Sequence, residues 1–184
     1  MVELKENVSL NFALRLMYPR PTVLVSCALD GKPNIITLAW STPLSHCPPL
    51  LGISVGLERY SHELIDKSGE FVVNIPTIDL IKQTILCGER SGREVDKFKE
   101  ANLTPLPSLK VRAPSILECV AHLECKVVQR IHVGDHTLFV GKVLAARVNE
   151  GLFKRVFNPE KIQLIMHLGS RDFTTNELKL RKAA

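Results

Sequence analysis

The sequence predicts a mainly β protein, an antiparallel barrel with a few short helices packed around it. Turn signals at Asp30–Gly31 and at Gly134–Asp135 each separate two apolar or alternating segments, so two antiparallel hairpins are expected. About seven strands are expected against three or four helices, which are too few and too irregularly spaced for a doubly wound parallel sheet. The 184 residues fit one domain, with residues 1–17 as an N-terminal arm or helix and 174–184 as a tail.

The first half of the chain alternates strands with short helices. Strands are expected at residues 22–29, 34–40, 50–55 and 70–75. The first two are apolar at nearly every position, which indicates that both of their faces are covered. Residues 41–49, rich in hydroxyl side chains and proline, are expected to form a loop.

Helix signals occur at four places. Residues 10–17 predict a short helix that ends before Pro19. A second helix is expected to begin with Ser61 as its N-cap and to end at Gly69. Two more are expected, one between Thr77 and Gly88 and one over residues 94–101.

The second half is dominated by a long alternating pattern. Residues 104–114 hold three prolines and are expected to be a connector. In residues 115–129 apolar and polar side chains alternate, which predicts a half-exposed strand with His122 on its solvent face. Its partner is expected at 137–148, and 162–168 is expected to be the last core strand, followed by a short segment at 170–173.

Composition and charge limit the classes of function. Hydrophobic residues make up 45% and charged residues 23%, as in soluble globular proteins, and no apolar stretch is long enough to span a membrane. The N-terminus lacks the features of a secretory signal, so a cytoplasmic protein is expected. The net charge of +5 suits anionic ligands. Nucleic acid is not an expected partner, because the basic residues are scattered and only KLRKAA at the C-terminus is a basic cluster.

Cysteine and histidine patterns predict neither disulfides nor a metal site. Five cysteines occur without a CxxC pair. Three of them lie in apolar patterns and are expected in the core, whereas Cys47 and Cys87 lie in less regular segments and are candidate pocket thiols. His132 and His136 flank a turn rather than share a helix face, so no metal site is predicted.

Two clusters of polar residues are candidate sites for an anionic ligand. Walker, GxGxxG and HExxH motifs are absent. The first cluster combines hydroxyl groups with a helix start, which together bind phosphate, although Glu63 in the same turn would repel it unless it points away. Its members are Thr37, Ser41, Thr42, Ser45, Ser54, Ser61 and His62. The second cluster offers cations for a phosphate or a dinucleotide and consists of Arg59, Ser91, Arg93 and Lys97. Ordinary loop hydroxyls and a solvated charged face remain the alternatives, as does a core role for Trp40.

A set of segments in the right order resembles a known family. They are PTVLVS, DGKPNIITLAW, STPLS, PPLLGISVG, RYSHELI and GEFVVNIP, followed by CGERSGREVDKF, GDHTLFVGKV and HLGSRDF. Over about residues 18–173 the chain resembles the flavin reductase-like, FMN-binding split-barrel family and is close to flavoredoxin. The resemblance implies a Greek-key split β-barrel that binds FMN and acts as a homodimer.

The resemblance also implies roles for individual residues. The ring and ribityl chain of FMN are expected against Thr37, Leu38, Ala39, Trp40, Ser41 and Thr42, with Ser54, Val55 and Gly56 alongside. The phosphate is expected near Arg59, Tyr60, Ser61 and His62, closed over by Ser91, Arg93 and Lys97. The pair Asp135–His136 is expected near the flavin or its reductant.

Three functions follow as hypotheses. The first is an FMN-dependent oxidoreductase that takes a hydride from NADH or NADPH. The second is an electron carrier, like flavoredoxin, that exchanges electrons with a protein partner. The third is a colourless basic module that binds nucleic acid.

Overall fold

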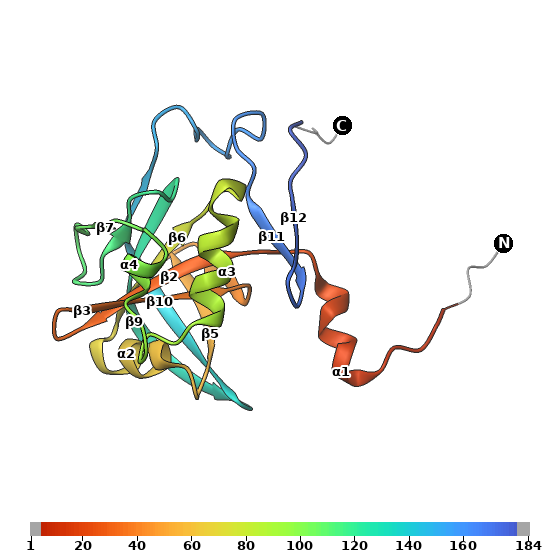
Figure 1. Cartoon of the computed structure of the whole chain (residues 1–184), viewed down its shortest axis with the longest axis horizontal. Coiled ribbons are helices and arrows are strands. Elements are labelled where there is room, and N and C mark those ends of the chain that lie inside the picture. The colour runs from red at the N-terminus through yellow and green to blue at the C-terminus, as the bar shows by residue number, and fades with distance from the viewer. Residues whose placement is uncertain (1–4, 180–184) are drawn as a thin grey trace.

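The computed structural model describes residues 5–179, in which a seven-stranded antiparallel sheet curls into a split barrel (Figure 1). The strands follow the order β3-β2-β6-β9-β10-β5-β4 across the sheet. Their bounds are Val23–Leu29 for β2, Lys32–Leu38 for β3, Ser41–Ser45 for β4, Leu50–Gly56 for β5, Glu70–Ile75 for β6, Ala121–Val133 for β9 and His136–Val148 for β10. Both predicted hairpins, β2–β3 and β9–β10, are confirmed.

A two-residue link closes the barrel. The strands at the two edges of the sheet, β3 and β4, are consecutive in the chain and are joined by Ala39 and Trp40. The carbonyl of Trp40 accepts a hydrogen bond from the amide of Ser54 on β5 at 2.9 Å. Between β3 and β5 themselves the described residues form no strand pairing, and this gap is the split of the barrel.

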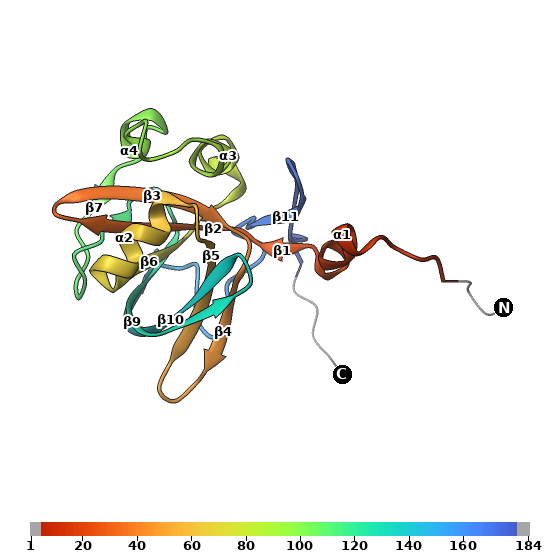
Figure 2. The ribbon, with the colours of Figure 1, turned by 90° about the horizontal axis from the view of Figure 1, so that it is seen from below.

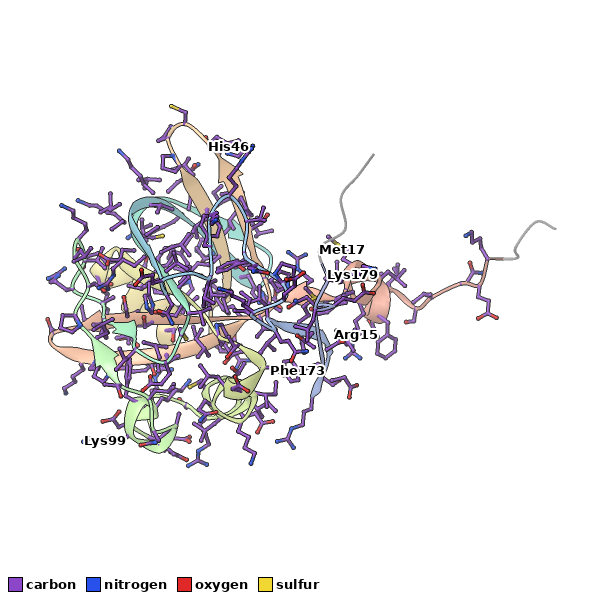
Figure 3. All side chains as sticks on the ribbon, turned by 90° about the horizontal axis from the view of Figure 1, so that it is seen from above. Arg15, Met17, His46, Lys99, Phe173 and Lys179 are labelled. Carbon is purple, nitrogen blue, oxygen red and sulfur yellow. The ribbon has the colours of Figure 1, made fainter. Side chains whose placement is uncertain are left out.

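The prediction that residues 41–49 form a loop is wrong for its first five residues. Ser41–Ser45 form β4, which pairs antiparallel with β5. Hydroxyl residues and Pro43 are typical of loops, but an edge strand tolerates both because one side of its backbone needs no partner. The tip of this β4–β5 hairpin carries His46, which projects from the barrel in Figure 3.

Strands β2 and β3 are covered on both faces, as predicted. Val23 and Val25 point into the barrel core, whereas Leu24 and Ile35 belong to a second core cluster outside it. The outer cluster includes Leu80, Cys87 and Phe98 from the helical layer. Figure 2 shows α3 and α4 above the sheet and the rest of the barrel below it.

The helices match the predicted positions with three corrections. Helix α2 (Tyr60–Ser68) begins with Arg59 as its N-cap, so Ser61 lies inside the first turn and is not the cap. Gly69 ends the helix in the left-handed region, as predicted. The turn η2 (Ile78–Leu80) leads into α3 (Ile81–Glu89), which continues through Gly88, and α4 is only Lys97–Glu100.

The last predicted core strand belongs to a separate sheet. Strand β11 (Ile165–Gly169) pairs with β1 (Arg20–Pro21) and with β12 (Asp172–Thr175), not with the barrel. Ile165 is buried, as a core strand would require, but the backbone partners of β11 come from both ends of the chain. A further short pair, β7 (Pro105–Leu106) with β8 (Ser115–Ile116), lies where a connector and the start of a long strand were predicted.

The N-terminal arm projects away from the barrel. Residues 10–17 are helical as predicted, as α1 (Leu10–Ala13) and the 3-10 turn η1 (Leu14–Met17). The arm lies on the far side of β11 and β12 from the barrel, and Arg15 and Met17 on it are labelled in Figure 3. Leu10 is 88% exposed and Leu16 is 72% exposed. No helix within residues 5–179 has the length and apolar character needed to cross a membrane.

A buried polar network overturns the predicted solvent face of β9. His122 and Glu124 are both buried, because the connector at residues 104–114 covers that face of the strand. The Glu124 carboxylate accepts hydrogen bonds from the backbone amides of Leu109 and Lys110. His122 Nδ1 lies 3.0 Å from the Oδ1 atom of Asn74. An alternating pattern therefore marked a strand correctly but not the environment of its polar face.

The buried state of His122 predicts a specific loss of stability in acid. Burial, and secondarily the positive charge of Arg147, lower its pKa from 6.5 to about 4. Above pH 6.5 the ring is neutral in both states; between 6.5 and about 4 the unfolded chain takes up a proton that the folded protein excludes. The free energy of unfolding should therefore fall by roughly 3 kcal/mol across this window because of His122 alone.

Urea denaturation of the natural protein and of His122→Gln at several pH values measures this contribution. The natural protein should lose more stability than the variant as the pH falls from about 6.5 to about 4, since Gln does not titrate. Parallel pH profiles for the two proteins would contradict the assignment.

Candidate functional site

The split of the barrel opens into a cavity of about 440 Å³, called the main cavity below. Its walls come from β3, the link that closes the barrel, β5, α3 and the small sheet. Eight of the predicted site residues line it, namely Thr37, Leu38, Ala39, Trp40, Ser54, Gly56, Arg59 and His136. The gap between β3 and β5 is thus where a ligand gains access to the strands.

One wall of the main cavity carries hydroxyl groups without partners. The side chains of Thr22 and Thr84 are buried, and neither hydroxyl oxygen has a hydrogen-bond partner within the protein. Both residues line the cavity. Because buried polar groups are nearly always satisfied, these two hydroxyls are suited to a polar ligand. On the same wall a Cβ atom added at Gly88 would lie 3.4 Å from the Cβ of Thr37, so α3 approaches β3 closely.

The other wall is aromatic. Trp40 Nε1 donates to the Tyr18 hydroxyl at 3.1 Å, and the Trp40 and His136 rings lie 4.9 Å apart. Tyr18 makes an edge contact with His167, which in turn packs on Phe173. These five rings form a continuous belt from β10 to β12, and Phe173 is labelled in Figure 3. A planar ligand between the two walls would contact ring faces on one side and small hydroxyl residues on the other.

His136 is held by its neighbour. Its Nδ1 atom lies 2.7 Å from the Asp135 carboxylate, and this hydrogen bond lowers the pKa of Asp135. With Nδ1 engaged, the Nε2 atom remains for a ligand in the cavity that the ring lines.

A smaller side cavity of about 120 Å³ continues from the main one. The two share Ile36, Arg59, Gly88 and Glu89. The first residues of α2, Tyr60 and Ser61, form part of its lining, so the positive end of the helix dipole faces it.

Lys97 supplies a buried cation to the side cavity. Its ammonium group donates to the carbonyls of Ile35 and Cys87, both at 2.7 Å, and burial lowers its pKa. An ammonium group has three N–H donors, so one remains for a ligand. Ser61 beside it accepts a hydrogen bond from Asn34 at 2.8 Å. Small volume, a helix start and a buried cation together suit a phosphate group.

Five predicted site residues lie outside both cavities. His62 Nε2 is 2.8 Å from the hydroxyl of Thr137, and burial lowers the pKa of the ring. Arg93 pairs with Glu63 at 3.0 Å and stacks over Tyr60. Ser41 and Thr42 line a separate pocket beneath the N-terminal arm, and Val55 is fully buried in the core. Ser91 does line the side cavity.

The electrostatic objection raised by Glu63 is removed by the structure. Its carboxylate pairs with Lys67 and with Arg93, and these contacts lower its pKa. The residue lines neither cavity. Its charge is therefore matched by two cations away from the proposed phosphate position.

Several lining residues were missed by sequence reasoning. Tyr18, Thr22, Thr84, Ile85, Gly88 and Glu89 lie there, together with His167, Ser170, Arg171 and Phe173. The last four stand in the HLGSRDF segment that contributed to the family resemblance, which was the available signal. For the threonines no local signal existed, because their importance depends on which strands meet.

The cysteines are free and do not line either cavity. Cys87 is buried in the outer core cluster, and burial raises its pKa to about 11, so it is not a pocket thiol. Cys47 is exposed at the β4–β5 turn. Among residues 5–179 no group of three metal-binding side chains is found.

Comparison with solved structures places this fold among flavin-binding proteins. An FMN-binding protein of Thermus thermophilus superposes with a TM-score of 0.86 at 25% identity over 100% of both chains. Flavoredoxin of Desulfovibrio vulgaris (Miyazaki F) superposes with a TM-score of 0.82 at 28% identity, over 90% of this chain and 91% of its own.

Relatives found by sequence include a flavin reductase, in agreement with the flavin-binding proteins found by structure. An uncharacterized protein of Archaeoglobus fulgidus is 43% identical over 165 residues, which is 89% of this chain and 92% of the relative. A flavin reductase (NADH) of Kitasatospora aureofaciens is 30% identical over 125 residues, or 67% of this chain and 63% of the relative. The model of the flavin reductase like domain matches residues 14–169. The chain therefore belongs to the flavin reductase-like family and has its mainly β, split-barrel fold.

Proposed function

We propose that this protein is an FMN-dependent oxidoreductase that takes a hydride from NADH or NADPH. The observation that carries the proposal is a cleft in two connected parts, a larger one with partnerless buried hydroxyls and a smaller one with a buried lysine. FMN has the same division into a planar ring and a phosphate. The likeness to a flavin reductase (NADH) supports the choice of reductant.

The chain's own groups divide the work of binding. In the main cavity Thr22 and Thr84 offer hydroxyls to polar edges of the isoalloxazine ring, and Thr37 and Gly88, which lie close together, form part of the wall beside it. In the side cavity Lys97, Arg59 and the start of α2 neutralise the phosphate. When bound, FMN accepts the hydride and passes the electrons on, so the protein needs to supply position rather than an acid or base.

The aromatic belt and His136 serve the reductant in this scheme. His136 is held in place by Asp135 and lines the same cavity as Trp40, so its Nε2 atom is the ring nitrogen proposed to face the reductant. Trp40 and Tyr18 line one side of the cavity and would shield a bound ligand there from water. Hydride transfer is favoured when the two rings are stacked and held close together.

Anaerobic mixing tests the activity directly. The purified protein loaded with FMN should be yellow, and NADH or NADPH should bleach the flavin absorbance within the time of a turnover. If a chemical reductant bleaches the flavin but neither nucleotide does, the protein does not oxidise NAD(P)H and the proposed function is wrong.

An electron carrier is the second candidate, favoured by the likeness to flavoredoxin at 28% identity. Such a protein would bind FMN tightly and exchange electrons with a protein donor or acceptor. Slow bleaching by NAD(P)H, together with fast reduction by a protein donor, would select this alternative.

We also propose that the protein is a cytoplasmic homodimer. The five free cysteines suit a reducing compartment. The arm of α1 and η1 exposes Leu10, Leu14 and Leu16 and buries none of its residues, so a second copy of the chain is the partner proposed to cover it. No role in binding nucleic acid or membranes is proposed.

Substitution of the arm tests the dimer. The double variant Leu10→Asp, Leu16→Asp should dissociate at least about tenfold more readily, because two apolar contacts become charges. Sedimentation equilibrium measures the change, and Leu109→Asp, on the exposed connector, is the control. A natural protein that is monomeric at micromolar concentration would refute the proposal.

Separate variants test the two parts of the cleft. Arg59→Gln should weaken FMN binding about tenfold but leave riboflavin, which has no phosphate, nearly unchanged. Thr84→Val should weaken both ligands alike, since it acts on the ring. Fluorescence titration gives the dissociation constants, with Arg93→Gln as the control because Arg93 lines neither cavity. Equal effects of Arg59→Gln and Arg93→Gln would show that the phosphate is placed elsewhere.

A further inference from the structure

An ion pair stands at the mouth of the main cavity. Arg171, at the turn between β11 and β12, contacts Glu89 at the end of α3 through two nitrogen atoms, with Nε–Oε1 at 2.8 Å and Nη2–Oε2 at 3.1 Å. The side chains are 72% and 50% exposed. The pair connects the small sheet to the helical layer across the opening.

Beyond this pair the cavity continues into an outer groove of about 530 Å³. The groove shares Ile85, Glu89 and Arg171 with the main cavity, so the ion pair lies on the boundary between them. Its floor is one face of α3, because Lys82, Ile85, Leu86 and Glu89 recur at helical spacing. Ile85 and Leu86 are half-buried there and give this face an apolar strip.

The groove is also cationic. Lys82, Arg90 and Arg171 line it, against Glu89 and Glu100. Arg90 is paired with Glu100 at 3.4 Å, and within residues 5–179 Lys82 has no ion pair. Exposed ion pairs contribute little to stability, so an incoming anion displaces them at little cost. Arg171 already uses a planar two-nitrogen geometry, which matches phosphate oxygens as well as a carboxylate.

We infer that the outer groove holds the diphosphate and adenosine half of the dinucleotide reductant. Arg171 exchanges Glu89 for the diphosphate, Lys82 adds a second positive charge, and the adenine ring lies on Ile85 and Leu86. The nicotinamide end then reaches through the boundary into the main cavity. This inference rests on the proposed function and assigns Arg171 and Glu89 opposite effects on the same ligand, Arg171 as its partner and Glu89 as its competitor.

The test compares a whole reductant with a truncated one. NADH and NADPH carry the diphosphate, whereas dihydronicotinamide riboside does not. On the FMN-loaded protein, Arg171→Gln should raise the ratio of the KM for the dinucleotide to the KM for the riboside about tenfold. Glu89→Gln should lower that ratio, because it removes the competitor of the diphosphate. Arg155→Gln, on the exposed turn before β11, is the matched control and should leave the ratio unchanged.

Titration calorimetry with the oxidised dinucleotide provides a readout that does not depend on turnover. The dissociation constant should rise in Arg171→Gln and fall in Glu89→Gln. If the pair is only a structural clamp, both variants change in the same direction, and the inference fails. Equal ratios in all variants, with normal bleaching, also overturn it while leaving the proposed function intact. If NADH, NADPH and dihydronicotinamide riboside all fail to bleach the flavin of the natural protein, the proposed function and this inference both fail.

Discussion

The link of Ala39 and Trp40 is the constraint on which the rest of the molecule depends. It joins the two edge strands of one sheet, so the sheet has to bend back on itself instead of remaining open. The hydrogen bond from Ser54 to the Trp40 carbonyl holds the bend against β5. Because β3 and β5 then lie near each other without pairing, a gap is left, and the main cavity forms in it. The same step of the chain thus closes the barrel and creates the site.

A second constraint keeps the opposite side of the barrel in place. Asn74 is fully buried, donates to the Leu24 carbonyl and the Ser26 hydroxyl, and accepts from the amide of Ile116. Together with Glu124 under the connector, it ties β2, β6, β8 and β9 to an otherwise irregular segment. Buried polar groups of this kind are stable only when every one has a partner, so the network specifies one arrangement of the connector. The cleft is therefore supported by strands whose positions are determined on both faces.

Acidic and basic side chains around the cleft are paired in a consistent way. Glu58 pairs with Arg59, Glu63 with Lys67 and Arg93, and Glu89 with Arg171. All of these pairs are exposed, so each is weak and easily exchanged. Lys97 differs because it is buried and held by two carbonyl groups. A cleft with one fixed cation and several exchangeable ones suits two phosphate-bearing ligands, a tightly held FMN and a dinucleotide that enters and leaves.

Local sequence determined the hairpins, most helix positions and the family. Turn residues such as Asp30 and Gly31, which adopt the left-handed region, act within a few residues, and apolar alternation reports the period of a strand directly. Candidate residues on β3 and β5, such as Thr37 and Ser54, were chosen from such local patterns, and both line the main cavity.

Features that depend on contacts between segments far apart in the sequence could be read only from the tertiary structure. The burial of His122 required the connector to cover it, and the pairing of β11 with β1 required the two ends of the chain to meet. Thr84 and Arg171 entered the site because α3 and the small sheet lie against the split. A periodic pattern encodes how a segment is built but not which segment covers its other face, since that is settled by the packing of the whole chain.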